Sequence, residues 1–241
     1  MDYSNLVLPK HIGIIIDGNG RWAVAHGKKR SYGHLMGSKR LREIGLYAFS
    51  KGLNILSIFA FSTENFKRAK EEVTYLMDLF AKNFKKELNS FKEKGVKVIF
   101  SGRRENLSLK LLKTMDTLVK DTENNKNGIL NICLNYGGQS EIIDGIKKIN
   151  KDFIENTINI DDLNEQTFKK YLYNELPEID FLIRTSGENR ISNFMLWQLA
   201  YAEMYFPKIH WPDFNTNEFD KAILEYNKRK RRFGGIKWNR E

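Results

Sequence analysis

The sequence contains a single cysteine among its 241 residues, Cys133, which lies in an apolar run. One thiol forms no intrachain disulfide, so nothing in the sequence requires an oxidising compartment. We expect Cys133 to be a small, buried core residue.

Long apolar segments are also missing. No stretch approaches the ~18 consecutive apolar residues that cross a bilayer, and the first residues show no signal-peptide pattern. We therefore expect a cytoplasmic protein, with at most peripheral contact at the inner face of the membrane. No break in composition marks a linker and no internal repeat is visible, which predicts a single domain over residues 1–241.

Positive charge, by contrast, is abundant. Lysine and arginine total 40 residues against 30 acidic ones, a formal net charge of +10. Such an excess indicates an anionic partner: nucleic acid, an acidic membrane surface or phosphorylated small molecules. Much of it lies in two runs, 28–30 and 228–232, each of which is equally consistent with a solvated surface.

Short apolar runs alternate with amphipathic helical patterns along the chain. The pattern predicts strands at 12–16, 55–61, 96–100, 129–134, 181–183 and 204–206. It predicts helices at 35–50, 70–94, 107–122, 140–156, 194–203 and 217–231, with a further helix, capped by Asp161 or Asp162, running to about Tyr173. Strands separated by helices indicate an α/β fold with a central, mainly parallel sheet covered on both faces.

Polar segments follow four of these predicted strands. They are residues 17–22, 62–68, 135–138 and 184–188. In open parallel sheets, ligands bind outside the carboxyl ends of the strands. We therefore expect these segments to form one binding site.

The first of these segments, Asp-Gly-Asn-Gly-Arg-Trp, is a candidate anion-binding turn. Gly18 and Gly20 allow main-chain amides to approach a ligand closely. The segment also satisfies the loose G-x-G-x-x-A pattern of dinucleotide-binding domains. Against that reading, Asp17 would face the pyrophosphate unscreened, and no acidic residue ends the second strand. Asp17 together with Arg21 fits better a diphosphate accompanied by a hard divalent cation such as Mg²⁺.

Further basic residues lie near the same strand ends. Arginine binds phosphate oxygens bidentately, and a histidine donates a hydrogen bond to them. Each residue taken singly is as well explained by a surface ion pair, whereas the set at one sheet edge favours a phosphate site. The set consists of Arg30, His34, Arg68, Arg184 and Arg190.

Two other features allow more than one interpretation. Asp161 and Asp162 resemble half of an aspartate-rich diphosphate site, but they stand alone where a helix cap is expected, which we prefer. Large apolar residues on the predicted helix 70–94 are either core packing, the preferred interpretation, or one wall of a tunnel for an apolar substrate. These residues are Phe80, Phe84, Leu88 and Phe91.

Six segments together resemble the cis-prenyltransferases, the isoprenyl transferases of the undecaprenyl diphosphate synthase type. They are HIGIIIDGNGRWA (11–23), AFSTENFKR (60–68), NYGG (135–138), LIRTSGE (182–188), SNFMLWQLAYAEM (192–204) and RRFGG (231–235). The resemblance implies a six-stranded, mainly parallel sheet with a hydrophobic tunnel, assembled as a homodimer. It implies Mg²⁺-dependent cis condensation of isopentenyl diphosphate onto an allylic diphosphate such as farnesyl diphosphate. The implied product is a long polyprenyl diphosphate, undecaprenyl diphosphate for a cell-wall lipid carrier.

The resemblance also implies roles for individual residues. Asp17 would be the essential carboxylate that holds Mg²⁺, and Glu203 a second metal ligand reaching the site at the dimer interface. The allylic diphosphate would contact Gly18, Asn19, Gly20, Arg21, Trp22, Arg30 and His34. The reacting groups would be positioned by Ser62, Thr63, Glu64, Asn65, Phe66 and Arg68. Isopentenyl diphosphate would contact Arg184, Arg190, Ile191 and Ser192.

Three points qualify these roles. Asn65 is implied as the proton acceptor, but an amide is a poor base, so orienting the substrate while diphosphate takes the proton is an equal alternative. Phe66 stands where the family usually has tryptophan, and Ala69 where it usually has proline. We expect activity to survive both changes, since neither alters a charged group. The terminal segment 232–235 resembles a tail that crosses to the partner's site.

Two functions from other classes remain to be weighed. A non-catalytic or regulatory subunit of a prenyltransferase complex would be expected to lack the aspartate, whereas Asp17 is present with the arginines. A nucleic-acid-binding protein would interleave basic residues with exposed aromatics along one face. Here the arginines gather at predicted strand ends, so we expect no nucleic-acid partner.

Overall fold

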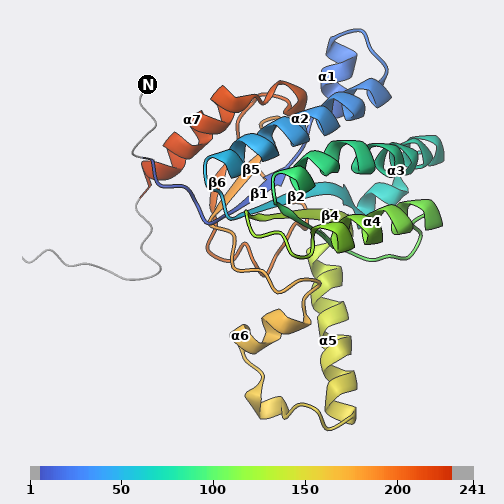
Figure 1. Cartoon of the computed structure of the whole chain (residues 1–241), viewed down its shortest axis with the longest axis vertical. Coiled ribbons are helices and arrows are strands. Elements are labelled where there is room, and N and C mark those ends of the chain that lie inside the picture. The colour runs from blue at the N-terminus through green and yellow to red at the C-terminus, as the bar shows by residue number, and fades with distance from the viewer. Residues whose placement is uncertain (1–5, 230–241) are drawn as a thin grey trace, which may run out of the picture.

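A six-stranded sheet forms the centre of the protein (Figure 1). The computed structural model describes residues 6–229. Every neighbouring pair of strands is parallel, in the order β3-β4-β2-β1-β5-β6. The strands are β1 (His11–Ile15), β2 (Ile55–Ser62), β3 (Lys97–Ser101), β4 (Ile129–Tyr136), β5 (Phe181–Arg184) and β6 (Glu203–Tyr205). The predicted six-stranded α/β sheet is confirmed, and it is parallel throughout rather than mainly so.

Helices and turns connect the strands. The helices are α1 (Asn19–Ala25), α2 (Arg30–Ser50), α3 (Lys70–Glu93), α4 (Leu109–Thr122), α5 (Gly138–Ile154), α6 (Glu165–Phe168) and α7 (Thr216–Asn227). The 3₁₀ turns are η1 (Thr63–Lys67), η2 (Ile160–Asp162), η3 (Lys169–Tyr171) and η4 (Trp211–Asp213). Local signals fix several ends: the Ser108 hydroxyl accepts from the amide of Leu111 to begin α4, and Gly95, at φ 71°, follows the end of α3.

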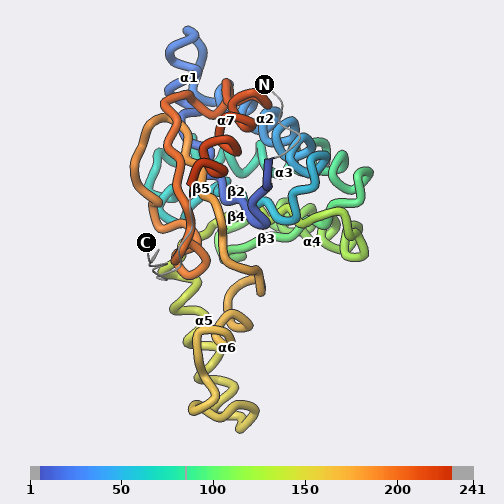
Figure 2. The backbone as a smooth tube through the Cα atoms, turned by 90° about the vertical axis from the view of Figure 1, so that its left-hand side faces the viewer, coloured from blue at the N-terminus to red at the C-terminus, as the bar shows by residue number. Residues whose placement is uncertain are grey.

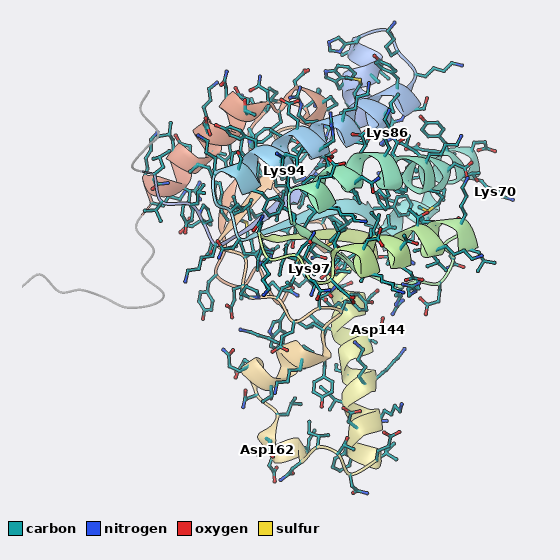
Figure 3. All side chains as sticks on the ribbon, viewed as in Figure 1. Lys70, Lys86, Lys94, Lys97, Asp144 and Asp162 are labelled. Atoms are coloured by element: carbon teal, nitrogen blue, oxygen red, sulfur yellow. The ribbon has the colours of Figure 1, made fainter. Side chains whose placement is uncertain are left out.

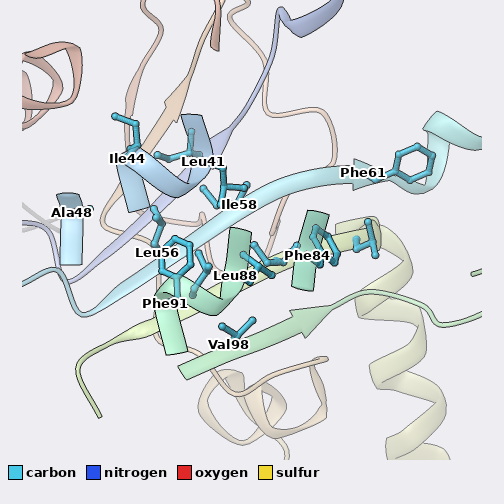
Figure 4. Packing of buried hydrophobic residues seen from close by; sticks show 14 of the residues in the cluster. Leu41, Ile44, Ala48, Leu56, Ile58, Phe61, Phe84, Leu88, Phe91 and Val98 are labelled. Atoms are coloured by element: carbon cyan, nitrogen blue, oxygen red, sulfur yellow. The ribbon is translucent and has the colours of Figure 1, made fainter. Parts of the chain in front are cut away.

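The main core lies between one face of the sheet and helices α2, α3, α4 and α7. Figure 4 shows Ile44 of α2 and Phe91 of α3 packed beside Leu56 and Val98 of the strands. All four side chains are fully buried. Burying side chains of this size stabilises the fold by about 2 kcal/mol each, relative to leaving them in water. The strands read as nearly continuous apolar runs because their other face is covered as well, by a second cluster that includes Phe59, Leu182 and Phe194.

Helix α5 projects from this body as an arm, with α6 beside it (Figures 1 and 2). A small separate cluster of Ile149, Phe168 and Leu172 holds the two helices together, and the Trp197 ring contacts Phe168 at 4.4 Å. Figure 3 places Asp162 near the far end of this arm, well away from the sheet. Exposed Asp161 and Asp162 are therefore not part of a diphosphate site at the strand ends.

The predicted helix from Asp161 or Asp162 to Tyr173 is wrong in its extent and its cap. The two aspartates lie in η2, and the following α6 and η3 are each only one turn long. The cap of α6 is Asn164, whose side chain accepts from the amides of Gln166 and Thr167. Asparagine competes equally well for this position, and the sequence offered several candidates.

The predicted helix at 194–203 is also wrong, since residues 194–202 form turns and loop and Glu203 begins β6. Met195 within this segment has a φ of 34°, and Ser192 and Asn193 just before it have φ values of 49° and 62°, which no right-handed helix accommodates. The apolar spacing arose instead from residues that pack into the second core cluster, where Phe194 and Met195 are both buried.

A chain of buried hydrogen bonds ties four strands together in register. The ring of His11 contacts the Pro177 carbonyl (2.9 Å) and the Ser57 hydroxyl (2.8 Å). Ser57 accepts from the Asn131 amide (3.0 Å), whose oxygen accepts from Ser101 (2.8 Å). Because a carbonyl only accepts, Nδ1 of the neutral ring carries the proton and Nε2 accepts from Ser57. Protonating Nε2 would place a donor against a hydroxyl that already donates to it.

Lowering the pH from 7 to 5 should therefore reduce the free energy of unfolding by about 2 kcal/mol through His11. Burial lowers the pKa of His11 from 6.5 to about 4, against the raising effects of the Pro177 carbonyl and the Asp180 charge. The unfolded chain then binds the extra proton between these values, so this stability is fully present above pH 6.5 and is lost as the pH falls.

Denaturant unfolding at several pH values measures this effect. His11→Gln should be less stable at neutral pH yet lose this part of the pH dependence, whereas His26→Gln, at an exposed position, should keep it. His34 contributes in the same window, because burial lowers its pKa to about 4 as well. An unchanged pH dependence in the His11 variant would contradict the assignment.

Cys133 is buried, as predicted. No helix within residues 6–229 is both long and apolar enough to cross a membrane. The predicted helix 217–231 corresponds to α7, and the basic run beyond Arg229 and the RRFGG segment lie outside the described residues.

Candidate active site

The carboxyl ends of β1, β2 and β5 open onto one cavity of about 250 Å³. The cavity has a polar end at these strand ends and an apolar end between the sheet, α2 and α3. Residues from three of the four polar segments meet at its polar end. The expected site residues in its lining are Asp17, Gly18, Asn19, Gly20, Arg21, Arg30, His34, Ser62, Asn65, Arg68, Arg184 and Ser192.

The turn after β1 needs its glycines for steric reasons. Gly18 has φ 94°, and a Cβ there would lie 2.0 Å from the Ser186 hydroxyl. A Cβ on Gly20 would lie 2.8 Å from the guanidinium carbon of Arg30. The absence of side chains lets Ser186 and Arg30 close around the turn, beside the carboxylate of Asp17.

Asp17 is held by two arginines. Its Oδ2 accepts from Nη2 of Arg184 at 3.0 Å, and Oδ1 lies 3.1 Å from Nη2 of Arg21. Oδ1 also accepts from the Gly18 amide at 2.6 Å. Partial burial raises the pKa of Asp17, but the hydrogen bond and charge of Arg184, the charge of Arg21 and the Gly18 amide together lower it below its usual value. Asp17 is therefore a carboxylate at neutral pH.

Arg184 is the most buried cation of the cavity, with 5% of its side chain exposed. Its Nη1 donates to the Arg190 carbonyl (2.5 Å) and the Ser192 hydroxyl (2.6 Å). Its Nε is buried without a hydrogen-bond partner among the described residues. An unpaired buried N–H costs about 1–3 kcal/mol, and an oxygen of a bound phosphate is the kind of acceptor that would remove this cost.

Glu188, which sequence reasoning did not assign, joins two of the arginines. It accepts from Arg21 at 2.5 Å and from Arg190 at 2.6 Å. These hydrogen bonds lower the pKa of its carboxyl group. The Arg190 side chain therefore points to Glu188, outside the cavity. Arg190 contacts Arg184 only through its backbone carbonyl, which accepts from Nη1 of Arg184. The LIRTSGE motif contains Glu188, but nothing local to the motif indicates that it pairs with Arg21 of a distant turn.

A second acid that sequence reasoning missed, Glu72 of α3, lies beside the remaining basic side chains. It lies 3.0 Å from Arg68, 4.0 Å from Arg30 and 3.8 Å from Nε2 of His34. Burial lowers the pKa of His34 to about 4 despite the charge of Glu72, so the ring is neutral at pH 7. A neutral ring donates one hydrogen bond without adding charge.

Asn65 is positioned by the turn that ends β2. Its side-chain oxygen accepts from the Ser62 amide at 3.1 Å, and the Ser62 side chain accepts from the Asn65 backbone in return. This reciprocal capping box starts η1. The capping box holds the Asn65 side chain in place through one of the two lone pairs of its amide oxygen, an arrangement that suits an orienting role.

Several expected site residues lie outside the cavity. Trp22 stacks on Tyr32 with ring centroids 6.2 Å apart. Glu203 lies at the amino end of β6, opposite to the sheet edge of Asp17, and pairs with Arg229 at 2.9 Å. The cavity lining also excludes Thr63, Glu64, Phe66, Arg190 and Ile191.

The apolar end of the cavity bears on the alternatives left open for α3. Phe84 and Leu88 belong to the core and Phe80 packs against it, as preferred, and all three also form one wall of the cavity. Phe91 is fully buried and does not line it. A bulge in β2 adds Phe61 to this wall, because the register with β4 shifts at this residue and turns its ring toward Phe80.

The donor set at the polar end fits a hard cation only in company with substrate. No group of three or more metal-binding side chains occurs within residues 6–229. Asp17 is the carboxylate at this end, and cationic side chains surround it. Mg²⁺ is commonly held by one or two carboxylates together with phosphate oxygens and waters, so Asp17 fits such an ion bound jointly with a diphosphate.

Comparisons with known proteins agree with this geometry. A family model described as putative undecaprenyl diphosphate synthase matches residues 15–234. An isoprenyl transferase of Fusobacterium nucleatum is 48% identical over 95% of this chain and 97% of its own. A Legionella pneumophila ditrans,polycis-undecaprenyl-diphosphate synthase, named as (2E,6E)-farnesyl-diphosphate specific, is 44% identical over 96% and 98%.

A further relative and a solved structure agree with these matches. A Pyrococcus horikoshii tritrans,polycis-undecaprenyl-diphosphate synthase, named as geranylgeranyl-diphosphate specific, is 46% identical over 95% of this chain and 88% of its own. The solved structure of lavandulyl diphosphate synthase from Lavandula x intermedia, in complex with dimethylallyl diphosphate, has a TM-score of 0.90 at 31% identity over 94% of this chain and 98% of its own. With its family model, its full-length relatives and its parallel sheet, the chain is a prenyltransferase and belongs to the cis-prenyltransferase family, of the undecaprenyl diphosphate synthase type.

Proposed function

We propose that the chain catalyses Mg²⁺-dependent, sequential cis condensation of isopentenyl diphosphate onto an allylic diphosphate such as farnesyl diphosphate, and that undecaprenyl diphosphate is the product. One observation carries the proposal: a cavity with a cationic, Asp17-containing end continues directly into an apolar wall of Phe80, Phe84 and Leu88. Such a cavity suits a molecule with a diphosphate head and a hydrocarbon tail.

The residues at the polar end support distinct roles in this reaction. Arg21, Arg30 and His34 bind the allylic diphosphate, and Arg184 with Ser192 binds isopentenyl diphosphate. Ionising the allylic diphosphate concentrates negative charge on the leaving group, which pre-oriented arginines stabilise as it develops. Bound Mg²⁺, held by Asp17 and the diphosphate, would supply further Lewis-acid stabilisation of that charge. Asn65 orients the substrate, and the diphosphate accepts the proton.

The direct test uses farnesyl diphosphate, labelled isopentenyl diphosphate and Mg²⁺, followed by sizing of the extracted lipid. We expect elongated products ending at undecaprenyl length, and none with EDTA. Folded protein that elongates no primer would overturn the proposal and favour the non-catalytic subunit. Parallel reactions with geranylgeranyl diphosphate identify the primer, since relatives of similar identity are named for different primers.

We also infer a homodimer that uses the arm. Ile143, Ile146, Phe153 and Ile154 of α5 each expose about half or more of their side chains, at 49%, 50%, 50% and 68%. Their spacing forms a stripe along one helix, and exposed apolar stripes of this kind mark interaction surfaces.

Sedimentation equilibrium should show a dimer, and Ile146→Asp should shift it toward monomer because a charge in a buried apolar contact is strongly unfavourable. Lys151→Asp, on the same helix but outside the stripe, serves as control. Identical association of both variants would contradict this interface. Across such a dimer Glu203 could approach the partner's site, which it does not do within its own subunit.

The proposed setting is a single catalytic domain, 1–241, in the cytoplasm. A polyprenyl product would bring the protein into transient contact with the membrane surface.

A further inference from the structure

Two consecutive residues after β5 have a backbone conformation that is unusual for their type. Ser192 and Asn193 have φ values of 49° and 62°. Asparagine tolerates this left-handed region better than most residues. The conformation still costs free energy, so it persists only where surrounding contacts hold the backbone in place. The two side chains point in different directions: Ser192 contacts Arg184, and Asn193 contacts Glu64.

The Ser192 side chain serves the diphosphate end of the cavity. Its hydroxyl accepts from Nη1 of Arg184 at 2.6 Å, and Arg184 in turn holds Asp17 at 3.0 Å. Ser192 thus completes the group of residues for which we propose isopentenyl diphosphate binding.

The Asn193 amide is engaged at both of its ends. Its Oδ1 accepts from the backbone amide of Gln139 at 2.8 Å. The backbone carbonyl of Asn193 also accepts, from the amide of Gly138 at 2.7 Å. Its Nδ2 donates to Oε1 of Glu64 at 2.9 Å. Because a backbone N–H only donates, Gln139 fixes the orientation of the amide, and Nδ2 must point to Glu64.

These contacts explain the NYGG segment, which has no place in the cavity. Gly137 is the N-cap of α5 and has no side chain to cap it, so Asn193 supplies the missing acceptors from outside the helix. A Cβ on Gly137 would lie 2.8 Å from both Asn193 Nδ2 and Thr63 Oγ1, and one on Gly138 would lie 2.6 Å from Leu196. The turn at 192–196 therefore packs directly against Gly137 and Gly138, where there is no room for a side chain.

Glu64 belongs to η1, the turn that carries Asn65. Burial raises the pKa of Glu64, but hydrogen bonds from Asn193, its own backbone and the hydroxyls of Ser62 and Thr63 lower it overall. The Glu64 carboxylate therefore accepts hydrogen bonds from donors of its own turn and from Nδ2 of Asn193.

We propose that Asn193 is a positioning residue for the condensation: through Glu64 it holds η1, with Ser62 and Asn65, at a fixed place relative to the Arg184–Ser192 end of the cavity. Asn193 itself lies outside the cavity lining. The inference rests on the roles proposed above for Asn65 and Arg184. It adds a specific link between the two halves of the site, which are more than 100 residues apart in sequence.

The test separates the two ends of one amide. Asn193→Asp keeps an acceptor for Gln139, tolerates the positive φ and suits a helix N-terminus, but it removes the donor and sets a second carboxylate against Glu64. We expect kcat to fall about tenfold, the effect of losing one charge-assisted hydrogen bond, while the melting temperature is kept and KM for isopentenyl diphosphate changes little.

The rescue is the decisive measurement. In Asn193→Asp/Glu64→Gln the amide and the carboxylate exchange places, so the introduced glutamine can donate to the introduced aspartate and restore the link. We expect this double variant to turn over faster than Asn193→Asp, with Glu64→Gln alone completing the double-mutant cycle. Asn156→Asp is the matched control, an exposed asparagine at φ 55° on the arm, and should behave like the unaltered protein.

Two results would overturn the inference: full kcat in Asn193→Asp, or a double variant no faster than that single variant. A role limited to capping α5 predicts the first result, because aspartate caps equally well. Failure of the proposed site would be recognised separately, because an Asp17 variant would then remain active whatever happens at Asn193.

Discussion

Replacing Asp17 by asparagine should lower turnover about a thousandfold, the usual scale for removing a group that stabilises transition-state charge. The asparagine oxygen can still accept from Nη2 of Arg184, which lies 3.0 Å from the carboxylate in the native site. The substitution therefore removes the charge needed for a divalent cation while it keeps the hydrogen bond from Arg184; the NH2 group that replaces Oδ1 no longer accepts from the Gly18 amide.

Stability should change much less than activity in this variant. Arg184 is almost fully buried and loses its counter-charge, which destabilises the fold, but the Arg190 carbonyl and Ser192 hydroxyl remain as acceptors. Alanine at position 17 would leave the guanidinium with less compensation and is the poorer test.

Initial rates with labelled isopentenyl diphosphate, measured over a range of Mg²⁺ concentrations, test this prediction, with thermal melting as the check on folding. Asp116→Asn is a suitable control, because Asp116 forms an exposed pair with Arg104 on the surface. Turnover of Asp17→Asn equal to that of the unaltered protein would refute the proposed metal role.

Replacing Arg184 by lysine should lower kcat/KM for isopentenyl diphosphate about a hundredfold. The native guanidinium reaches Asp17, the Arg190 carbonyl and the Ser192 hydroxyl at once, and its Nε is still without a partner among the described residues. A lysine ammonium keeps the positive charge but cannot span these acceptors and a phosphate oxygen together. The loss should appear mainly in KM for isopentenyl diphosphate, with KM for the allylic primer changing less.

Steady-state kinetics with each substrate varied in turn distinguish these effects. Arg104→Lys makes the same substitution at an exposed pair, in which Nη2 of Arg104 donates to both carboxylate oxygens of Asp116, and should leave both KM values unchanged. If Arg184→Lys instead raised KM for the allylic primer alone, the proposed division of the cavity between the two substrates would be wrong.

Much of this architecture follows from local sequence. The apolar runs at 12–16 and 129–134 read as strands because both faces of a parallel sheet are buried, and they correspond to β1 and β4. Asp17 and Arg184 were recognisable as site residues because each directly follows or ends such a run, and parallel topology brings those ends to one edge.

Errors arose where apolar spacing served tertiary packing rather than a helix. Phe194 and Met195 are buried in the second core cluster, and Ser192 and Asn193 adopt positive φ angles that the spacing pattern cannot reveal. The cap of α6 was misplaced for a different reason: Asn164 and the nearby aspartates are chemically similar N-cap residues, so the sequence does not distinguish between them.

The sequence by itself therefore determined the parallel α/β fold, the family and the set of strand-end residues, because these depend on periodicity and on motifs of adjacent residues. Only the tertiary structure decided which side chains meet: Glu188 with Arg21, Glu72 with Arg68, and Asn193 with Glu64. It also decided that Phe84 lines the cavity whereas Phe91 does not. Spacing along one helix is the same for both rings, and only the position of the neighbouring sheet and of α2 leaves space beside one of them.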